Sequence, residues 1–183
     1  AKNEVGRKYV GVFCPSASSP QITLAKIIST MCLAVNEARI FSNNNLNAYD
    51  PYWTHLLYFN SIRELMSGSS LIQADVKGNL RGEYYRKGMT KEFVGDFFKE
   101  MRRGVYKVDE LTSRVQSSSV PKILDQLFTQ HNRENNNSLD LCLSTNMIQV
   151  GVDIPRLALM TIVGQPKTTS EYIQASSRVG RDK

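Results

Sequence analysis

Three polar residues near the end of the chain have types and a spacing that suit phosphate chemistry. In the stretch EYIQASSRVGR, residues 171–181, Gln174 is followed by Arg178 four positions later and by Arg181 seven positions later. On a helix these three residues fall on one side. Two guanidinium groups on adjacent turns repel each other unless an anion meets both. The simpler alternative, a pair of solvated arginines favoured by the dipole of the last helical turn, carries equal weight on this stretch alone.

A second polar stretch, STNMIQVGVDIPRL at 144–157, follows an apolar run that predicts a strand. Thr145 stands where that strand should end. Gly151 allows the backbone to bend or to approach a ligand closely. The carboxylate of Asp153 can accept hydrogen bonds from hydroxyl groups such as those of a ribose, and Pro155 closes the turn. Taken by itself, this stretch also fits an ordinary loop.

The elements that must position these residues alternate between strands and helices. Apolar, often β-branched runs predict strands at 8–15, 54–60, 108–114, 139–145 and 158–164. Helices are expected at 22–35, 61–66, 90–101, 117–130 (with a serine cap) and from Thr168, where a capping box begins. Irregular structure is expected at 42–51 and 68–88.

Repeated β–α units with apolar strands predict an α/β fold of three layers, in which helices cover both faces of a parallel sheet. Ligands of such sheets bind beyond the carboxyl ends of the strands. The loops that follow residues 60, 114, 145 and 164 are therefore expected to carry function.

The composition is that of a globular chain with an uneven distribution of charge. The 183 residues have a formal net charge of +6, and 41% of them are hydrophobic, which excludes a disordered chain. From Lys77 to Lys107 there are nine basic and four acidic residues, a surplus of five positive charges. Such a surplus suits a nucleic-acid backbone, and a solvated charged face explains it equally well.

Other classes of protein find little support in the sequence. No apolar run is long enough to cross a bilayer, and the first residues do not resemble a secretory signal. Cys14, Cys32 and Cys142 form no CxxC pair and are interpreted as buried, reduced thiols of a cytoplasmic protein. His55 and His131 each stand alone and are expected to be surface or packing residues, so we assign no metal site to the chain.

Together, the two polar stretches resemble motifs V and VI of superfamily 2 helicases. QASSRVGR follows the motif VI pattern Q-x-x-G-R-x-G-R, with Ser177 in place of the first glycine. STNMIQVGVDIP is similar to motif V, with Asn146 in place of an aspartate, and LLYFNSIRELM at 56–66 looks like motif IV. The resemblance spans the whole second RecA-like domain. ELTSR, GVDIPRL and QPKTTSEYIQASSRVGR look like the large prokaryotic helicases of DISARM-type phage defence.

The resemblance implies a RecA-like, P-loop NTPase-like domain that completes an ATP site held elsewhere. Arg178 and Arg181 would be arginine fingers that reach the γ-phosphate, and Gln174 would polarise or sense the same site. Gly151 and Asp153 would touch the nucleotide at the domain interface. No G-x-x-x-x-G-K-[ST] loop occurs in the chain. That loop and the Mg²⁺ ligands are therefore expected in an N-terminal RecA-like domain of the same polypeptide.

The resemblance also implies contacts to a nucleic-acid backbone, which position a strand without reading its bases. Thr145 would hydrogen-bond a phosphate. The weaker candidates for such contacts are Asn60, Ser61, Ser113 and Arg114. The segment 67–107 is longer than the usual connection after motif IV, so we expect a basic insertion with helical or irregular structure. Its candidates for binding a single strand by charge are Arg81, Arg86 and Lys87, for which a solvated face is equally plausible.

These observations favour the second motor lobe of an ATP-dependent helicase or translocase, which uses ATP with Mg²⁺ and acts on DNA rather than RNA. Two alternatives stay open. One is a noncatalytic nucleic-acid-binding scaffold, against which the arginine spacing argues. The other is a duplex DNA translocase that does not separate strands. Residues 1–183 alone are expected to form one monomeric domain that binds nucleotide weakly and hydrolyses nothing.

Overall fold

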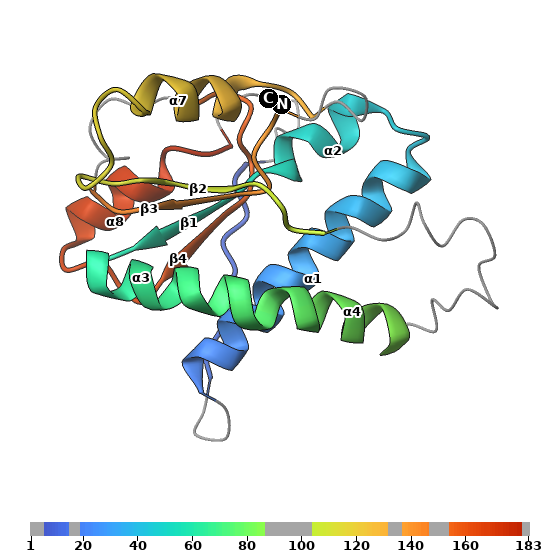
Figure 1. Ribbon diagram of the computed structural model, residues 1–183, viewed down its shortest axis with the longest axis horizontal. Coiled ribbons are helices and arrows are strands. Elements are labelled where there is room, and N and C mark those ends of the chain that lie inside the picture. Colours follow the sequence, from blue (N-terminus) through green and yellow to red (C-terminus); the bar gives the residue numbers. More distant parts are fainter. Residues whose placement is uncertain (1–5, 15–18, 87–103, 132–136, 147–153, 181–183) are drawn as a thin grey trace.

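The computed structural model describes residues 6–14, 19–86, 104–131, 137–146 and 154–180. Within these ranges, four parallel strands form one sheet in the order β2–β3–β1–β4 (Figure 1). The strands are β1 (His55–Phe59), β2 (Val108–Leu111), β3 (Leu141–Ser144) and β4 (Met160–Val163). All four lie inside ranges that the sequence predicts as strands. Because parallel neighbours need crossover connections, helices run between them.

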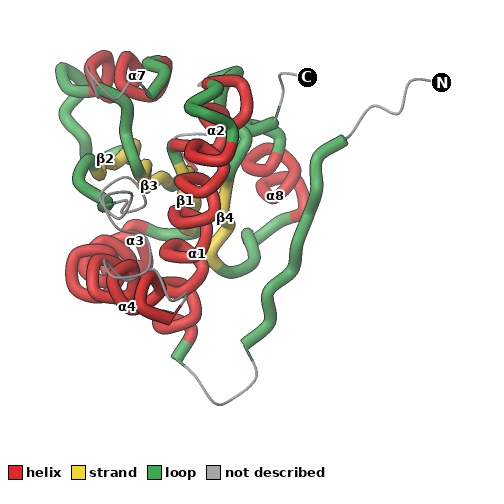
Figure 2. The backbone as a smooth tube through the Cα atoms, turned by 90° about the vertical axis from the view of Figure 1, so that its right-hand side faces the viewer, coloured by secondary structure: helices red, strands yellow, loops and turns green. Residues whose placement is uncertain are grey.

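Helices cover both faces of the sheet, as predicted (Figures 1 and 2). One face carries α1 (Pro20–Phe41), α3 (Ile62–Leu71), the π-helical turn η1 (Ile72–Val76) and α4 (Lys77–Arg86). The other face carries α7 (Val120–Phe128) and α8 (Thr169–Ser176). A further helix, α2 (Leu46–Trp53), packs on α1. The helix predicted at 90–101 lies outside the described residues.

Each strand divides its side chains between two cores because successive residues point to opposite faces. Leu57 and Leu143 pack against α1 and α3, whereas Leu56 and Cys142 pack against α7 and α8. All four are at most 1% exposed, and burying each leucine stabilises the fold by about 1.5–3 kcal/mol. Burial also raises the pKa of the Cys142 thiol to about 12, which makes it an inert core residue as the sequence predicts.

The irregular structure predicted at 68–88 is wrong for its described part, which is helical. The scattered glycines of this stretch led to that prediction, but Gly68 does not interrupt the helix. A Cβ atom at this position would lie 2.5 Å from the Phe59 ring, so glycine lets α3 pack directly on β1. The extra residue of the π-helical turn then joins α3 to α4 without a break.

The prediction of an asparagine-rich loop at 42–51 is also wrong in part, because most of this stretch forms α2. Asn43 and Asn44 take positive φ angles of 54° and 61° and end α1, a conformation that asparagine tolerates better than most residues. Asn45 then caps α2 by accepting a hydrogen bond from the backbone N–H of Asn47 at 3.2 Å. Ser119, by contrast, makes no side-chain capping bond at the start of α7, so the predicted serine cap is absent there.

The strand predicted at 8–15 is wrong as well. Residues 6–14 run as an extended segment outside the sheet, and their apolar side chains are exposed, by 60% at Tyr9 and 87% at Phe13. The residues of this segment favour a strand, but the segment does not pair with any of the described strands. In the described part of the chain, no helix combines the length and apolar character needed to cross a membrane.

Candidate functional site

The carboxyl ends of the four strands meet at one edge of the sheet, which lies on the left in Figure 1. Tyr58 pairs with Ser144, and Leu111 pairs with the same residue from the other side. Five predicted contact residues follow these strand ends directly: Asn60, Ser61, Ser113, Arg114 and Thr145. The structure therefore brings this group together at the edge where parallel sheets bind ligands.

Thr145 is the most unusual member of this carboxyl-edge group. Its side chain is 4% exposed, and its hydroxyl has no hydrogen-bond partner among the described residues. The preceding Ser144 hydroxyl, in contrast, donates to the carbonyl of Leu57 at 3.2 Å. An unsatisfied buried hydroxyl costs about 1–3 kcal/mol. The Thr145 hydroxyl is thus a donor in place for a group that arrives from outside this set of residues.

Asn60 and Ser61 shape the turn beside Thr145. The side-chain amide of Asn60 donates to the carbonyl of Val163 at 3.0 Å and so ties the end of β1 to the end of β4. Ser61 caps α3 by accepting from the N–H of Glu64 at 3.2 Å, while the Glu64 carboxylate accepts from the N–H of Asn60. These bonds fix the amino end of α3 at the carboxyl edge, where its free N–H groups and dipole favour an anion.

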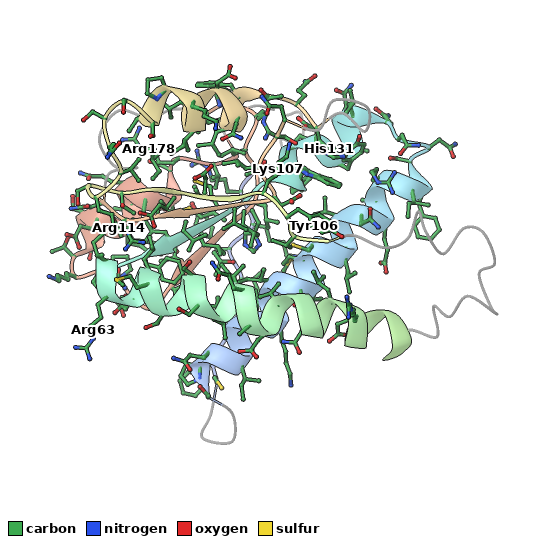
Figure 3. All side chains as sticks on the ribbon, viewed as in Figure 1. Arg63, Tyr106, Lys107, Arg114, His131 and Arg178 are labelled. Atoms are coloured by element: carbon green, nitrogen blue, oxygen red, sulfur yellow. The ribbon has the colours of Figure 1, made fainter. Side chains whose placement is uncertain are left out.

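Arg63 is a residue of this edge that the sequence analysis missed. It lies in the first turn of α3, is exposed, and points away from the fold at the end to which the strands run (Figure 3). No hydrogen bond or ion pair engages its guanidinium within the described residues. A cation at a helix amino end is unfavourable by about 0.3–1 kcal/mol. The sequence signal was present, as a basic residue two positions after a capping serine.

Arg114 lies at the same edge but is already paired. Its Nε and Nη2 groups each donate to the carboxylate of Glu110 at 2.6 Å. This two-pronged bond lowers the pKa of the Glu110 carboxyl below its ordinary value. Ser113, next to it, is exposed. The pair makes the end of β2 nearly neutral, so Arg114 is a weaker anion site than its residue type suggests.

Of the predicted finger residues, Arg178 lies in the turn after α8, and Arg181 falls outside the described residues. The capping box that opens α8 is present as predicted, but the helix ends at Ser176. The prediction that Gln174 and Arg178 share one helical face is therefore wrong, because Arg178 lies in the turn beyond the helix. Gln174 is exposed, and Arg178 is half-buried on the side of the sheet covered by α7 and α8 (Figure 3).

The turn that carries Arg178 has a defined backbone. Ser177 adopts right-handed angles, φ −76° and ψ −5°, so a side chain is tolerated where the motif has glycine. Gly180 has φ +66°, in the region that favours glycine. Its N–H donates to the carbonyl of Leu157 at 2.7 Å. Because Leu157 precedes β4, this turn is separate from the carboxyl-edge group.

Of the remaining predicted residues, Arg81 is described with its side chain, and it joins neither group. The helix from α3 to α4 runs from the carboxyl edge to the opposite end of the molecule (Figure 1), so the exposed Arg81 on α4 lies far from Thr145. Four predicted residues fall outside the described residues, and so does the side chain of a fifth. The four are Arg181, Gly151, Asp153 and Lys87, and the side chain is that of Arg86.

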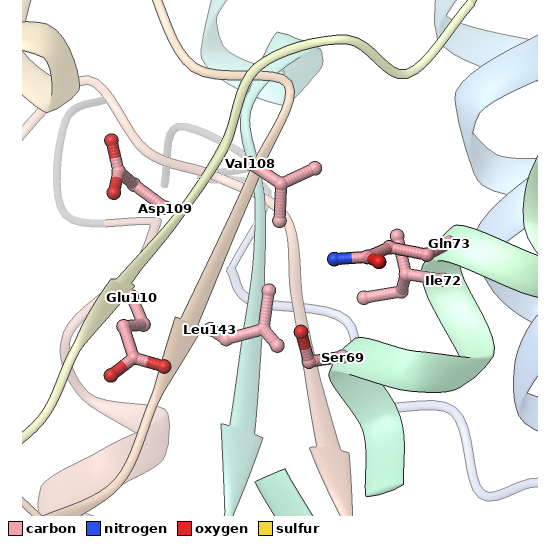
Figure 4. A pocket seen from close by; sticks show the side chains of 7 residues that line it. All are labelled: Ser69, Ile72, Gln73, Val108, Asp109, Glu110 and Leu143. Atoms are coloured by element: carbon pink, nitrogen blue, oxygen red, sulfur yellow. The ribbon is translucent and has the colours of Figure 1, made fainter. Parts of the chain in front are cut away.

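A small cleft lies between α3, η1 and the edge strand β2 (Figure 4). Its volume is about 140 Å³, and its lining includes Ser69, Gln73 and Glu110. Sites for small organic ligands usually measure about 300–1,000 Å³, so this cleft suits water better than a nucleotide. Within the residues that the structure describes, no cluster of histidine, cysteine or acidic side chains could hold a metal ion.

Arg156, at the end of the motif V stretch, forms a buried junction that sequence reasoning did not find. Its guanidinium donates to the carbonyl of Leu127 and to the Thr54 hydroxyl, both at 2.7 Å, and pairs with Asp50 at 3.2 Å. Burial lowers the pKa of Arg156, and the charge of Asp50 opposes that shift. The junction connects α2, α7 and the start of β1, and it anchors the base of the loop that leads from β3 to β4.

Comparisons with known proteins agree with this fold. The family model described as the helicase conserved C-terminal domain matches residues 82–183, more than half of the chain. Over 178 residues, the chain is 42% identical to the DISARM protein DrmA of Bacillus paralicheniformis. That alignment covers 97% of this chain and 14% of the relative, so the chain spans about a seventh of the protein that it matches. The parallel sheet, with helices on both faces, is thus a RecA-like domain of the helicase C-terminal type.

Proposed function

Because the chain belongs to the helicase conserved C-terminal domain family, we propose that it is the second motor lobe of an ATP-dependent helicase or translocase. In this role its carboxyl edge grips the phosphate backbone of a nucleic acid. The observation that carries the proposal is the buried hydroxyl of Thr145, which has no partner among the described residues and stands beside the amino end of α3.

Three kinds of donor would act on neighbouring phosphate groups of one strand. The hydroxyl of Thr145 donates a hydrogen bond, the first N–H groups of α3 add their dipole, and the guanidinium of Arg63 supplies charge. The hydrogen bond from the Asn60 amide to the Val163 carbonyl fixes the position of the amino end of α3 relative to the sheet. Contacts of this kind hold a strand at any sequence, as a motor that moves along a strand requires.

The turn after α8 would serve the nucleotide. Gln174 and Arg178 offer amide and guanidinium donors, and these groups suit phosphate oxygens rather than a metal ion. We therefore propose that ATP and its Mg²⁺ are held by a preceding lobe of the same polypeptide, with Arg178 and Arg181 meeting the γ-phosphate. The separation of this turn from the carboxyl edge supports a motor that handles nucleotide and strand on two surfaces.

We further propose that the strand is DNA, and that the protein acts in the cytoplasm. The noncatalytic scaffold is less favoured, because a pure binder has no use for a half-buried arginine in a turn fixed by a positive φ. A strand-separating helicase and a duplex translocase would use the same carboxyl edge.

The test is the substitution Thr145→Val in the full-length protein, which removes the hydroxyl and keeps the shape. A hydrogen bond to a charged group contributes about 1.5–3 kcal/mol, so affinity for single-stranded DNA should fall at least about tenfold. The control is Thr129→Val, which removes a hydroxyl that bonds the carbonyl of Asp125 within α7. Equal affinity of the Thr145 variant and the wild type would refute the proposed grip.

A further inference from the structure

The side chain of Arg7 contacts the backbone on both sides of Arg178. Its Nε donates to the carbonyl of Val179 at 2.8 Å, and its Nη2 donates to the carbonyl of Ser177 at 3.4 Å. Arg7 lies on the extended segment 6–14, which passes beside α8 (Figure 2). Residues about 170 positions apart in sequence thus meet at the turn that follows α8.

The chemistry of a helix end explains why an arginine is suited to this place. The last carbonyl groups of a helix lack partners within it and form the negative end of its dipole. A guanidinium supplies positive charge and several donors in one rigid plane. Arg7 therefore satisfies carbonyls of the turn that directly follows α8, close to the negative end of the helix dipole, although it comes from a distant segment.

The same turn is also bonded to the fold through Gly180. The N–H of Gly180 bonds to the carbonyl of Leu157 at 2.7 Å, and Val179 is 8% exposed and packs in the core between the sheet and α8. A Cβ atom added at Gly180 would lie 3.4 Å from Cγ of Arg7. The backbone on either side of Arg178 is thus fixed by Arg7, by the core and by Leu157.

We propose that Arg7 is a positioning residue for Arg178. By holding the carbonyls of Ser177 and Val179, it sets the direction in which the Arg178 side chain leaves the backbone. This inference rests on the proposed function, in which Arg178 meets a phosphate of ATP. Catalytic groups must be held within about 0.5 Å of their working position, so a loosened turn slows the chemical step more than it weakens ATP binding.

The segment that carries Arg7 is attached to the fold mainly by polar contacts. Its apolar side chains are exposed, with Val10 at 69% and Val12 at 60%, so burial adds little to its attachment. At the far end of the segment, the Thr23 hydroxyl donates to Sγ of Cys14 at 3.1 Å. A displacement of this segment would therefore pull on the Arg178 turn before it disturbed the core.

The experiment measures ATP hydrolysis by the full-length protein with single-stranded DNA. Arg7→Ala should lower kcat about tenfold, since bonds from a charged donor are lost, while KM for ATP changes less than about twofold. Arg7→Lys keeps the charge without the planar fork and should recover part of the loss. The control is Lys8→Ala, which removes the neighbouring exposed cation and should leave kcat unchanged.

A double-mutant cycle separates positioning from general stability. If Arg7 acts through Arg178, Arg7→Ala should cause no further loss of kcat in an Arg178→Ala background. Fully additive losses, or a normal kcat in both Arg7 variants, would overturn the positioning role while the proposed function stands. A normal kcat in Arg178→Ala alone would overturn the proposed function itself.

Discussion

The guanidinium of Arg114 and the carboxylate of Glu110 form a two-pronged pair, with both nitrogen–oxygen distances at 2.6 Å. Glu110 belongs to β2, and Arg114 follows the strand by one turn. A basic residue at the carboxyl edge is in this way held by an acid of its own strand. The pair leaves Arg63 as the cation at this edge that has no partner within the described residues.

Breaking the pair should strengthen the grip on a strand. Glu110→Gln removes the negative charge and leaves Arg114 available to a phosphate. One more phosphate contact should steepen the dependence of log K on log salt by about 0.7 for a single strand. Salt titrations of DNA binding by fluorescence anisotropy measure the slope, with Asp125→Asn on α7 as the control. A slope that does not steepen would show that the strand does not pass Arg114.

The same pair gives a prediction for pH. Because Arg114 lowers the pKa of Glu110 in the folded protein, the pair stabilises the fold above the pKa that this carboxyl has in the unfolded chain. That contribution is lost as the pH falls through the folded value, which lies below the ordinary value of about 4.3. In urea unfolding, the free energy of unfolding of the wild type should therefore exceed that of Glu110→Gln by the same amount at pH 6 and pH 8. This difference should vanish in stronger acid. A difference that grew on acidification would contradict the assigned pairing.

Arg63 should contribute to binding without contributing to stability. Arg63→Ala is expected to flatten the salt dependence by about 0.7, the effect of one lost phosphate contact. The unfolding midpoint should stay level or rise slightly, because the change removes a cation from the amino end of α3. Lys26→Ala, on the exposed side of α1, provides the control. An unaltered slope for Arg63→Ala would remove this residue from the strand path.

The basic residues predicted in the segment 67–107 are tested separately, because Arg81 on α4 lies at the other end of the molecule from the carboxyl edge. Charge reversal at Arg81, Arg86 and Lys87 should flatten the salt dependence if the strand continues from the carboxyl edge along α4. The measurement is the same titration with oligonucleotides of increasing length. A salt slope equal to that of wild type at every length would confine binding to the carboxyl edge.

Substitution by alanine at two glycines should change the free energy of unfolding in opposite directions. Gly180→Ala places a side chain at φ +66° and should lower the free energy of unfolding by about 1 kcal/mol. Gly78, inside α4, has no atom within 4 Å of an added Cβ, so Gly78→Ala should raise stability by about 0.5–1 kcal/mol. Denaturant unfolding of both variants checks the pair. A Gly180→Ala protein with the free energy of unfolding of the wild type would contradict the left-handed conformation of Gly180 in the turn beside Arg178.

The sequence predicted the sheet and the edge at which its strands end, because these depend on short-range patterns. Apolar runs marked all four strands, and the parallel arrangement followed from their alternation with helices. Local reasoning failed where one residue type serves two purposes. The scattered glycines of 68–88 led to a prediction of irregular structure, although Gly68 lets α3 pack against Phe59. Likewise, the asparagines from Asn43 to Asn45 end one helix and start the next.

The sequence predicted several residues that follow the strand ends, but not which side chains form pairs. Thr145 and Asn60 stand at strand ends, which the sequence shows directly. The bond between Arg7 and the turn at Val179 joins residues 172 positions apart, and no local pattern reports such a contact. Likewise, Arg63 became notable only when its surroundings showed which cations were paired and which were open to a ligand.

The central claim is that this lobe completes an ATP site with the turn after α8. The direct measurement is DNA-stimulated ATP hydrolysis by the full-length Arg178→Ala protein, with Lys167→Ala as a nearby exposed control. Arginine fingers contribute about 10³–10⁵ to kcat, so hydrolysis should fall by at least about a thousandfold while DNA affinity stays within about twofold. Turnover equal to that of wild type would contradict the account.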